Sequence, residues 1–248
     1  MPTLLLCLAG PMQSWGTRSR FEERDTGLEP SKSAVLGLLC AALGRDRSQT
    51  IDDLTPLRMG VRVDREGILK RDYHTAQEVI QADGRLNSSP SMRNVISERY
   101  YLADAVFLVG LEPPSPTPLL DELHQALKNP HWPLFLGRKA FVPSQSVFLA
   151  DGLDELSLEQ SLKSYPLLVQ AGEEQAPKKY RFILETPKGS HLRYDQPASS
   201  FAERHFLPRR VEITSESLAS HSPHRHGDEP EVLNALPRPT QTRSQTSS

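Results

Sequence analysis

This chain of 248 residues has few cysteines, no long apolar run and no large excess of charge of one sign. Its two cysteines, Cys7 and Cys40, are too few for a disulfide framework or a structural zinc site. No run reaches the roughly 18 apolar residues of a transmembrane helix. The first residues lack the basic segment and cleavage site of a signal peptide, so we expect a cytoplasmic location with no membrane contact.

The net charge of −2, from 29 Lys+Arg and 31 Asp+Glu, argues at first against a nucleic-acid-binding protein. The distribution along the chain changes that interpretation. Residues 128–145 carry three basic residues and no acid, and residues 178–210 carry eight basic and three acidic residues. Acidic residues gather at 151–160 and after 211. The sequence therefore predicts a local basic track that suits one specific RNA rather than a uniformly basic surface.

Apolar periodicity and capping signals predict an α+β fold. The expected elements are strand 3–8, helix 32–43 with Ser31 as its cap, strand 57–63, strand 105–111, a helix beginning at Pro118 and strand 132–136. This βαββαβ order is that of a ferredoxin-like domain, the plan on which RNA-recognition-motif domains are also built, and we expect it to span residues 1–140.

Residues 64–104 interrupt that domain and are too long for a passive loop. Their ends, 68–75 and 98–104, are expected to pair as the arms of a protruding hairpin. Residues 141–213 are expected to form a small C-terminal β-rich extension with a helix over 153–162 and a strand over 180–185. Residues 214–248, rich in Ser, Thr, Pro and His, are expected to be a disordered polar tail.

The segment Gly10–Gly16 follows the first strand and places Gln13, Ser14 and Trp15 between two glycines. Trp15 has two interpretations that the sequence leaves open. It either packs into the core beneath a turn or stacks on an RNA base, while Gly16 lets the backbone approach a phosphate.

Several further residues are candidate phosphate ligands. The start of the first helix offers hydroxyl and amide groups at Ser31–Ser33, although capping alone also explains the serine. Gly137 precedes two cations with no acid nearby, although solvated charges at a turn are an equal alternative. The candidates from these segments are Arg20, Arg24, Lys32, Ser33, Arg138, Lys139 and Arg209.

Arg71, Tyr73 and His74 lie together in the first expected hairpin arm. With Lys139, the phenol and imidazole would form a Tyr/His/Lys set able to cleave RNA without a metal. A structural or base-stacking role for Tyr73 and His74 is the more common case. No motif for nucleotide, metal or cofactor binding is present, so no cofactor, metal ligand or catalytic residue is assigned.

Five linked segments resemble one family. They are 8–16, 30–39, 71–75, 101–105 and 136–139. In this order and spacing they resemble the CRISPR-associated repeat-binding family, in particular its type I-E members in the Cascade complex. The resemblance is strong over about 3–150 and looser around Arg209.

The resemblance implies a modified RNA-recognition fold in which the 64–104 insertion is a thumb hairpin. It also implies binding of the crRNA 5′ handle, with packing beside the helical backbone subunit and the large DNA-inspecting subunit. Target DNA would be met only through the complex. In this subtype another subunit cuts the precursor, so the expected role is a non-catalytic RNA-binding subunit for antiviral defence. The alternatives are a metal-independent endoribonuclease of repeat RNA and a structural adaptor that contacts only protein.

Overall fold

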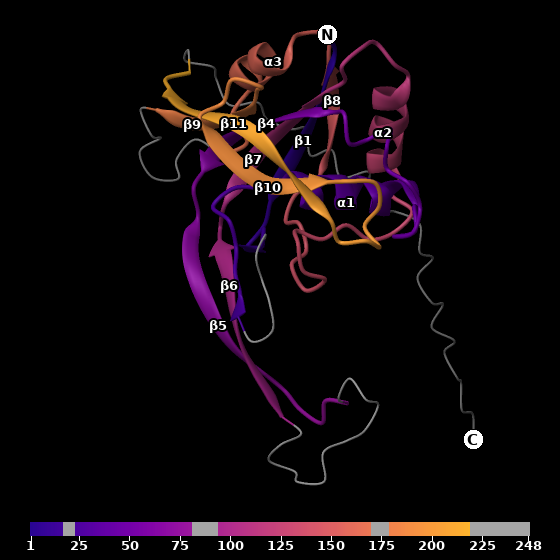
Figure 1. The fold of residues 1–248 in the computed structure, drawn as a ribbon. Helices are drawn as coiled ribbons and strands as arrows, with labels where there is room; N and C mark the ends of the chain where they lie inside the picture. Colours follow the sequence, from indigo (N-terminus) through magenta and orange to yellow (C-terminus); the bar gives the residue numbers. More distant parts are fainter. Residues whose placement is uncertain (17–22, 81–93, 170–178, 219–248) are drawn as a thin grey trace, which may run out of the picture.

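The computed structural model describes residues 1–16, 23–80, 94–169 and 179–218. Figure 1 shows a body built around a twisted sheet, from which one long hairpin extends. Within the described ranges no helix is long and apolar enough to cross a membrane. The predicted tail begins too early, because residues 214–216 pair with a neighbouring strand, and residues 219–248 lie outside the described ranges.

The main sheet of the described residues has seven strands in the order β10-β11-β9-β4-β7-β1-β8. All neighbouring strands in it are antiparallel. The strands are β1 (Thr3–Ala9), β4 (Arg58–Arg65), β7 (Val106–Glu112), β8 (Phe148–Asp154), β9 (Tyr180–Glu185), β10 (His191–Pro197) and β11 (Phe206–Glu216). The strands on either side of residue 140 thus share one sheet, and the domain boundary drawn there stays a prediction.

Helices cover both faces of this sheet. Helices α1 (Lys32–Leu43) and α2 (Leu119–Lys128) pack on one face, where their leucines join Leu4, Leu6 and Leu8 in one core. Helix α3 (Leu158–Ser164) packs on the other face against Leu5 and Cys7. Because successive strand residues point to opposite faces, a strand covered on both sides must be apolar throughout. This explains the uninterrupted apolar run of β1.

The first five predicted elements are confirmed to within about two residues at their described ends. Helix α1 begins after Ser31, whose side chain makes no capping hydrogen bond, and ends at Gly44 with φ of 72°. Both cysteines are buried as expected, and burial raises the pKa of Cys7 to about 12 and that of Cys40 to about 11.

The predicted strand 132–136 is wrong. Pro130 and Pro133 lack the N–H groups that a strand in a ladder needs, and the segment forms a loop instead. Its Trp132 N–H donates to the Ala41 carbonyl at the end of α1. The strand that completes the sheet beside β1 is β8, and the predicted helix 153–162 is shifted, since β8 runs to Asp154 and α3 starts at Leu158.

A second sheet forms the hairpin and its base. Strands β5 (Ile68–Ala76) and β6 (Val95–Ala103) pair in antiparallel register over nine residues, which confirms the predicted pairing of the two arms. Short strands β2 (Met12–Gln13) and β3 (Glu23–Arg24) pair with the other edge of β6. This places the segment after β1 directly beside the hairpin.

A buried ion pair fastens β4 to the layer of α3. The Arg62 guanidinium donates to both oxygens of Asp64 at 2.6 and 2.9 Å, and neither side chain is exposed to solvent. The same guanidinium donates to the carbonyls of Leu162, Tyr165 and Pro166 at the end of α3. Because the buried cation has both a counter-ion and acceptors for its other N–H groups, it is accommodated without unpaired charge.

Candidate nucleic-acid interface

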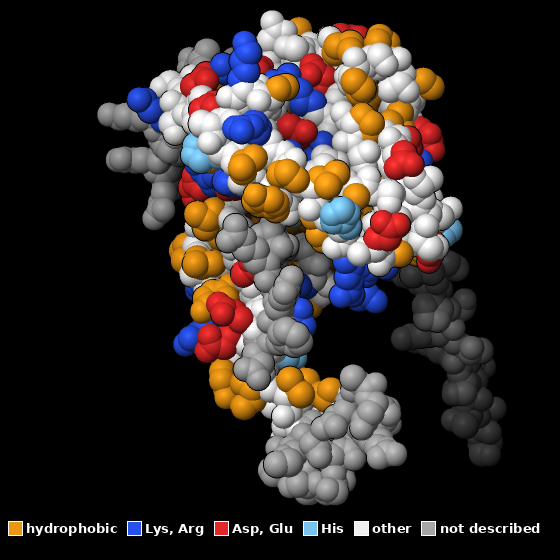
Figure 2. Space-filling model, viewed as in Figure 1, with side chains coloured by type: hydrophobic (Ala, Val, Ile, Leu, Met, Phe, Trp, Pro, Cys, Tyr) orange, Lys and Arg blue, Asp and Glu red, His pale blue; other side chains and the backbone are white. Residues whose placement is uncertain are grey.

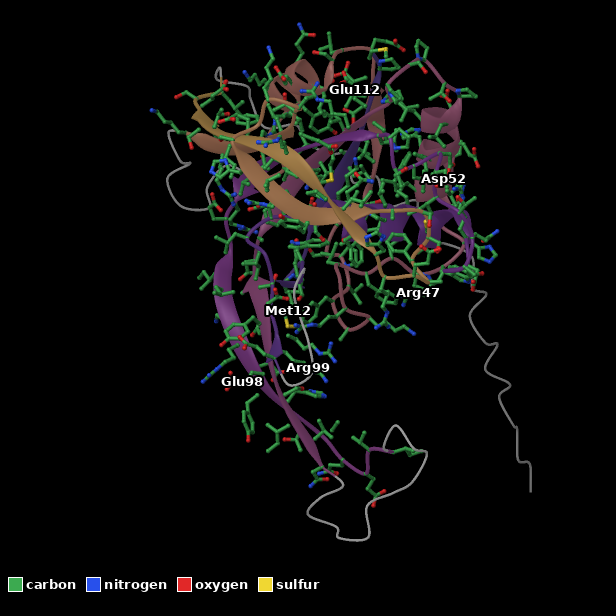
Figure 3. All side chains as sticks on the ribbon, viewed as in Figure 1. Met12, Arg47, Asp52, Glu98, Arg99 and Glu112 are labelled. Carbon is green, nitrogen blue, oxygen red and sulfur yellow. The ribbon has the colours of Figure 1, made fainter. Side chains whose placement is uncertain are left out.

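The main candidate site is a hollow of about 510 Å³ between the base of the hairpin and the start of α1. We call it the arginine hollow, because three arginines line it together with serines, glycines and two phenylalanines. Its lining consists of Ser14, Gly16, Arg24, Asp25, Ser31, Ser33, Ala34, Arg99, Gly137, Arg138, Phe201 and Phe206. Figure 3 labels Met12 in β2, which pairs with the base of β6, and Arg99 in β6, further from the body.

Three guanidiniums meet in the arginine hollow. Arg24 in β3 and Arg99 in β6 are neighbours in the parallel register of these strands. Arg138 donates to the backbone carbonyls of Tyr100 at 2.9 Å and Arg24 at 3.4 Å. Among the described residues, none of these three side chains forms a salt bridge to a carboxylate. Asp25 is the one carboxylate in the described lining, against three guanidiniums, so the lining of the hollow carries a net positive charge.

The electrostatics of Arg138 agree with this arrangement. Its partial burial lowers its pKa most, and the nearby positive charge of Arg99 lowers it further, with a smaller contribution from Arg24. Asp72 and Asp25 act in the opposite direction without cancelling the shift. An arginine stays protonated under such conditions, so the three like charges repel one another. An anion with several oxygens, such as an RNA phosphate, would relieve that repulsion through charge-assisted hydrogen bonds.

Gly137 fixes the position of Arg138. Its φ is 94°, and a Cβ atom at this residue would lie 1.8 Å from the carbonyl oxygen of Ser14. The Ser14 N–H donates to the Leu136 carbonyl at 3.0 Å, so the loop lies directly against the chain that follows β1. Only glycine allows this close approach together with a positive φ. The Arg138 guanidinium then lies 5.3 Å from the centre of the Phe141 ring.

The start of α1 contributes hydroxyl groups to the arginine hollow. The side-chain oxygens of Ser31 and Ser33 are 3.4 Å apart, and both residues line the hollow. The positive end of the helix dipole adds to the field of the arginines. The predicted anion site at Ser33 is therefore placed beside the predicted cation Arg138, although the two are more than 100 residues apart in the chain.

Of the two interpretations of Trp15, the structure supports the one in which it packs into the core. Its side chain is 1% exposed and belongs to the main core, and its backbone N–H donates to the Thr26 hydroxyl. The predicted base-stacking platform is wrong for this side chain as the structure places it. Gln13 is also buried, and its amide donates to the Leu8 and Ala105 carbonyls, so it ties β2 to β1 and β7 rather than facing RNA.

Lys32 and Arg209 were expected at phosphates, and the structure pairs both with carboxylates instead. The ammonium of Lys32 lies 3.1 Å from Glu185, and its backbone N–H donates to Asp195. Arg209 donates to both oxygens of Asp195 at 2.7 and 2.9 Å. These buried pairs hold β9, β10 and β11 against α1. The basic stretch 178–210 is therefore in part a structural network, which a count of charges cannot reveal.

The hairpin residues predicted from the sequence, Arg71, Tyr73 and His74, are not in the lining of the arginine hollow. Arg71 is exposed and pairs with Glu98 across the strands at 3.0 Å. Tyr73 is exposed, and the ring of His74 lies 3.7 Å from a carboxylate oxygen of Asp72. Consecutive strand residues point to opposite faces, so the structure does not bring the Tyr73 and His74 side chains together as a catalytic pair. Lys139 is exposed beside Arg138, and Arg20 lies outside the described residues.

Sequence reasoning missed Arg99, Phe201 and Phe206, all of which line the arginine hollow. Arg99 lies in a hairpin arm that was predicted correctly. The alternation of side-chain direction along that strand was the pattern that could have indicated Arg99. No local sequence pattern indicated the two phenylalanines. They lie around the start of β11, far along the chain from α1, and the fold brings that segment beside the start of α1.

Comparisons with known proteins identify the family of the chain. The family model described as CRISPR-associated protein (Cas_Cas5) matches residues 3–212. The Escherichia coli (strain K12) protein "CRISPR system Cascade subunit CasD" is 36% identical over 159 residues, which is 59% of this chain and 69% of that protein.

Two solved structures are similar over most of the chain. One, described as "Crystal structure of Cas protein", is 47% identical with a TM-score of 0.71 and covers 87% of this chain and 95% of its own. A chain from a "CRISPR RNA-guided surveillance complex" is 32% identical with a TM-score of 0.71, covering 87% and 90% respectively. Since the family model spans residues 3–212, the chain belongs to the Cas5 family of CRISPR-associated proteins.

Proposed function

We propose that this chain is the non-catalytic crRNA-binding subunit of a type I-E CRISPR surveillance (Cascade) complex, and that it holds the 5′ handle of the crRNA in the cytoplasm. The observation that carries the proposal is the arginine hollow. Three guanidiniums without carboxylate partners among the described residues converge there with Ser31 and Ser33. Such a site suits the phosphates of a sharply bent single strand.

The arrangement of the sheet supports an RNA-recognition fold. Strands β4, β7, β1 and β8 lie side by side in that order, and α1 and α2 follow β1 and β7 in the chain. We infer that these six elements form a ferredoxin-like core, the plan that RNA-recognition motifs share. In this proposal the β5–β6 hairpin is the thumb, and Arg71, Tyr73, His74 and Lys139 remain candidate RNA contacts along its approach.

The partners in this proposal are the crRNA, the helical backbone subunit and the large DNA-inspecting subunit. Support comes from the relatives, one described as a Cascade subunit and one as part of an RNA-guided surveillance complex. Co-purification from a strain with and without the CRISPR RNA separates the RNA-binding role from a protein adaptor, since an adaptor would assemble equally well in both.

The decisive test is the salt dependence of RNA binding. We expect Arg138→Ala combined with Lys139→Ala to weaken binding of repeat RNA and to flatten the slope of log K against log salt by about 0.7 for each lost phosphate contact. Lys128→Ala, an exposed lysine at the end of α2, is the matched control and should leave the slope unchanged. An unchanged slope in the double variant would refute the assignment of the arginine hollow.

The same purified protein tests the endoribonuclease alternative. Incubation with labelled repeat RNA in EDTA should leave the RNA intact if the chain only binds it. Cleavage that disappears in His74→Ala would contradict the non-catalytic role.

A further inference from the structure

A second hollow adjoins the arginine hollow. It has a volume of about 270 Å³, and Ser31 lies in the walls of both. Leu28, Leu192 and Tyr194 surround it with exposed fractions of 54%, 46% and 54%. We call it the neutral hollow. Figure 2 shows a group of hydrophobic side chains over the position of β10, the strand that carries Leu192 and Tyr194.

The charges in the wall of the neutral hollow are already paired. Arg193 lies 2.8 Å from Glu29, and Arg209 lies 2.7 Å from Asp195. Burial alone would raise the pKa of Glu29, but hydrogen bonds from Arg181 and Arg193 outweigh it and keep the pKa below its ordinary value. This wall therefore offers no excess positive charge to a phosphate. It offers apolar surface and an aromatic face, which suit an uncharged flat group.

The backbone links the two hollows. Ser14 and Gly16 line the arginine hollow, and Trp15 between them lines the neutral one. Because the hollows share Ser31 and lie along the same Ser14–Gly16 backbone, adjacent nucleotides of one strand can occupy them.

We propose that the neutral hollow holds one unstacked base of the bound RNA, with Tyr194 stacked against it and Leu28 and Leu192 enclosing its edges. This inference rests on the proposed function of the arginine hollow, because the phosphates there bring the base into place. Tyr194 is thus a further RNA-binding residue, and it contributes through its aromatic face rather than through charge.

The experiment uses the full-length chain and the RNA that co-purifies with it, resynthesised as fluorescent oligonucleotides with one abasic ribose at each position in turn. We expect Tyr194→Ala to bind the intact RNA about ten-fold more weakly, as for loss of one base–aromatic stack. The salt slope should not change, because no phosphate contact is lost. At one abasic position the wild type and Tyr194→Ala should bind equally, and Tyr194→Phe should restore wild-type affinity for intact RNA.

Two variants control for folding and for exposed aromatic surface in general. Tyr194→Leu keeps apolar bulk and should lose affinity as Tyr194→Ala does. Trp132→Ala removes an exposed aromatic side chain from the loop after α2 and should bind the intact RNA like the wild type.

The outcomes separate this inference from the proposed function. If Arg138→Ala flattens the salt slope while Tyr194→Ala binds every probe as the wild type does, the base site is refuted and the arginine hollow stands. If neither variant changes binding, both proposals fail. If Tyr194→Ala binds RNA normally but no longer co-purifies with other subunits, the neutral hollow holds a protein segment and the base assignment is wrong.

Discussion

Arginines occupy two contrasting environments in this molecule. In strands β4, β9 and β11, Arg62, Arg181 and Arg209 each pair with a carboxylate and lose most of their contact with water. In the arginine hollow, Arg24, Arg99 and Arg138 approach one another and, among the described residues, form no salt bridge. The first group stabilises the fold, whereas the second group leaves positive charge for an anion. Whether an arginine is neutralised within the fold thus depends on the carboxylate that the fold places beside it.

Removal of the most deeply buried ion pair should have the largest effect on the free energy of unfolding. Arg62→Ala leaves the Asp64 carboxyl without its counter-ion in a site with no exposure and removes donors from three carbonyls near α3. We expect a loss of about 3–5 kcal/mol in the free energy of unfolding, measured by urea denaturation. Arg62→Met with Asp64→Leu should lose less, because no unpaired charge remains. An equal loss in the two variants would contradict the charge explanation.

A fall in pH should weaken the ion pairs of the structural arginines before it changes the charge of the arginine hollow. Because hydrogen bonds from Arg181 and Arg193 lower the pKa of Glu29 from 4.5, its ionised form stabilises the fold fully above that pH. That stabilisation should be lost as the pH falls through the lowered pKa. Glu29→Gln should cost about 1.5–3 kcal/mol at pH 7 and flatten the decline of stability in acid. Thermal melts of both proteins between pH 7 and pH 3, about four units that span the usual titration range of a glutamate carboxyl, test this prediction. Parallel curves of stability against pH for the two proteins would contradict it.

A backbone change should show that the arginine hollow depends on geometry as well as charge. Gly137→Ala places a methyl group against the Ser14 carbonyl at a residue with φ of 94°. We expect a loss of about 1–3 kcal/mol in stability and weaker RNA binding, because the loop must move and takes Arg138 with it. Unfolding and RNA titrations measure the two effects. Gly37→Ala is the control, because a Cβ at Gly37 would lie 3.7 Å from the Phe201 ring, an ordinary contact. Wild-type behaviour of Gly137→Ala would contradict the role of the contact with Ser14.

The smallest effect should come from an exposed pair on the hairpin. Arg71 and Glu98 lie 3.0 Å apart with side-chain exposures of 57% and 40%. We expect Arg71→Ala to change the free energy of unfolding by about 0–1 kcal/mol, since solvent screens such pairs. If the hairpin contacts RNA, this variant should nevertheless reduce the salt slope. A large loss of stability would place Arg71 with the structural arginines instead.

The sequence was sufficient wherever local pattern decides structure. Helix α1 was predicted residue for residue because an apolar stripe, a serine before it and Gly44 after it all agree. The hairpin arms were found because the insertion was too long to be passive. The strand at 132–136 failed because its short apolar run resembles a strand, while Pro130 and Pro133 prevent pairing.

The candidate site was only partly visible in the sequence. Ser14, Arg24, Ser33 and Arg138 were named and do meet in the arginine hollow. Lys32 and Arg209 were named for the same reason, their charge, and proved to be paired with Glu185 and Asp195. A basic residue looks the same in a sequence whether or not the fold brings a carboxylate to it.

The sequence alone determined the types of the first five elements, the apolar run of β1 and the family resemblance, because these depend on periodicity and on residues close together in the chain. Only the tertiary structure decided which charges are neutralised, since Arg209 meets Asp195 across a strand pair and Arg24 meets Arg99 across β3 and β6. Charge interactions depend on distance in space and on exclusion of water. Neither the distance nor the exclusion of water can be read from the order of the residues.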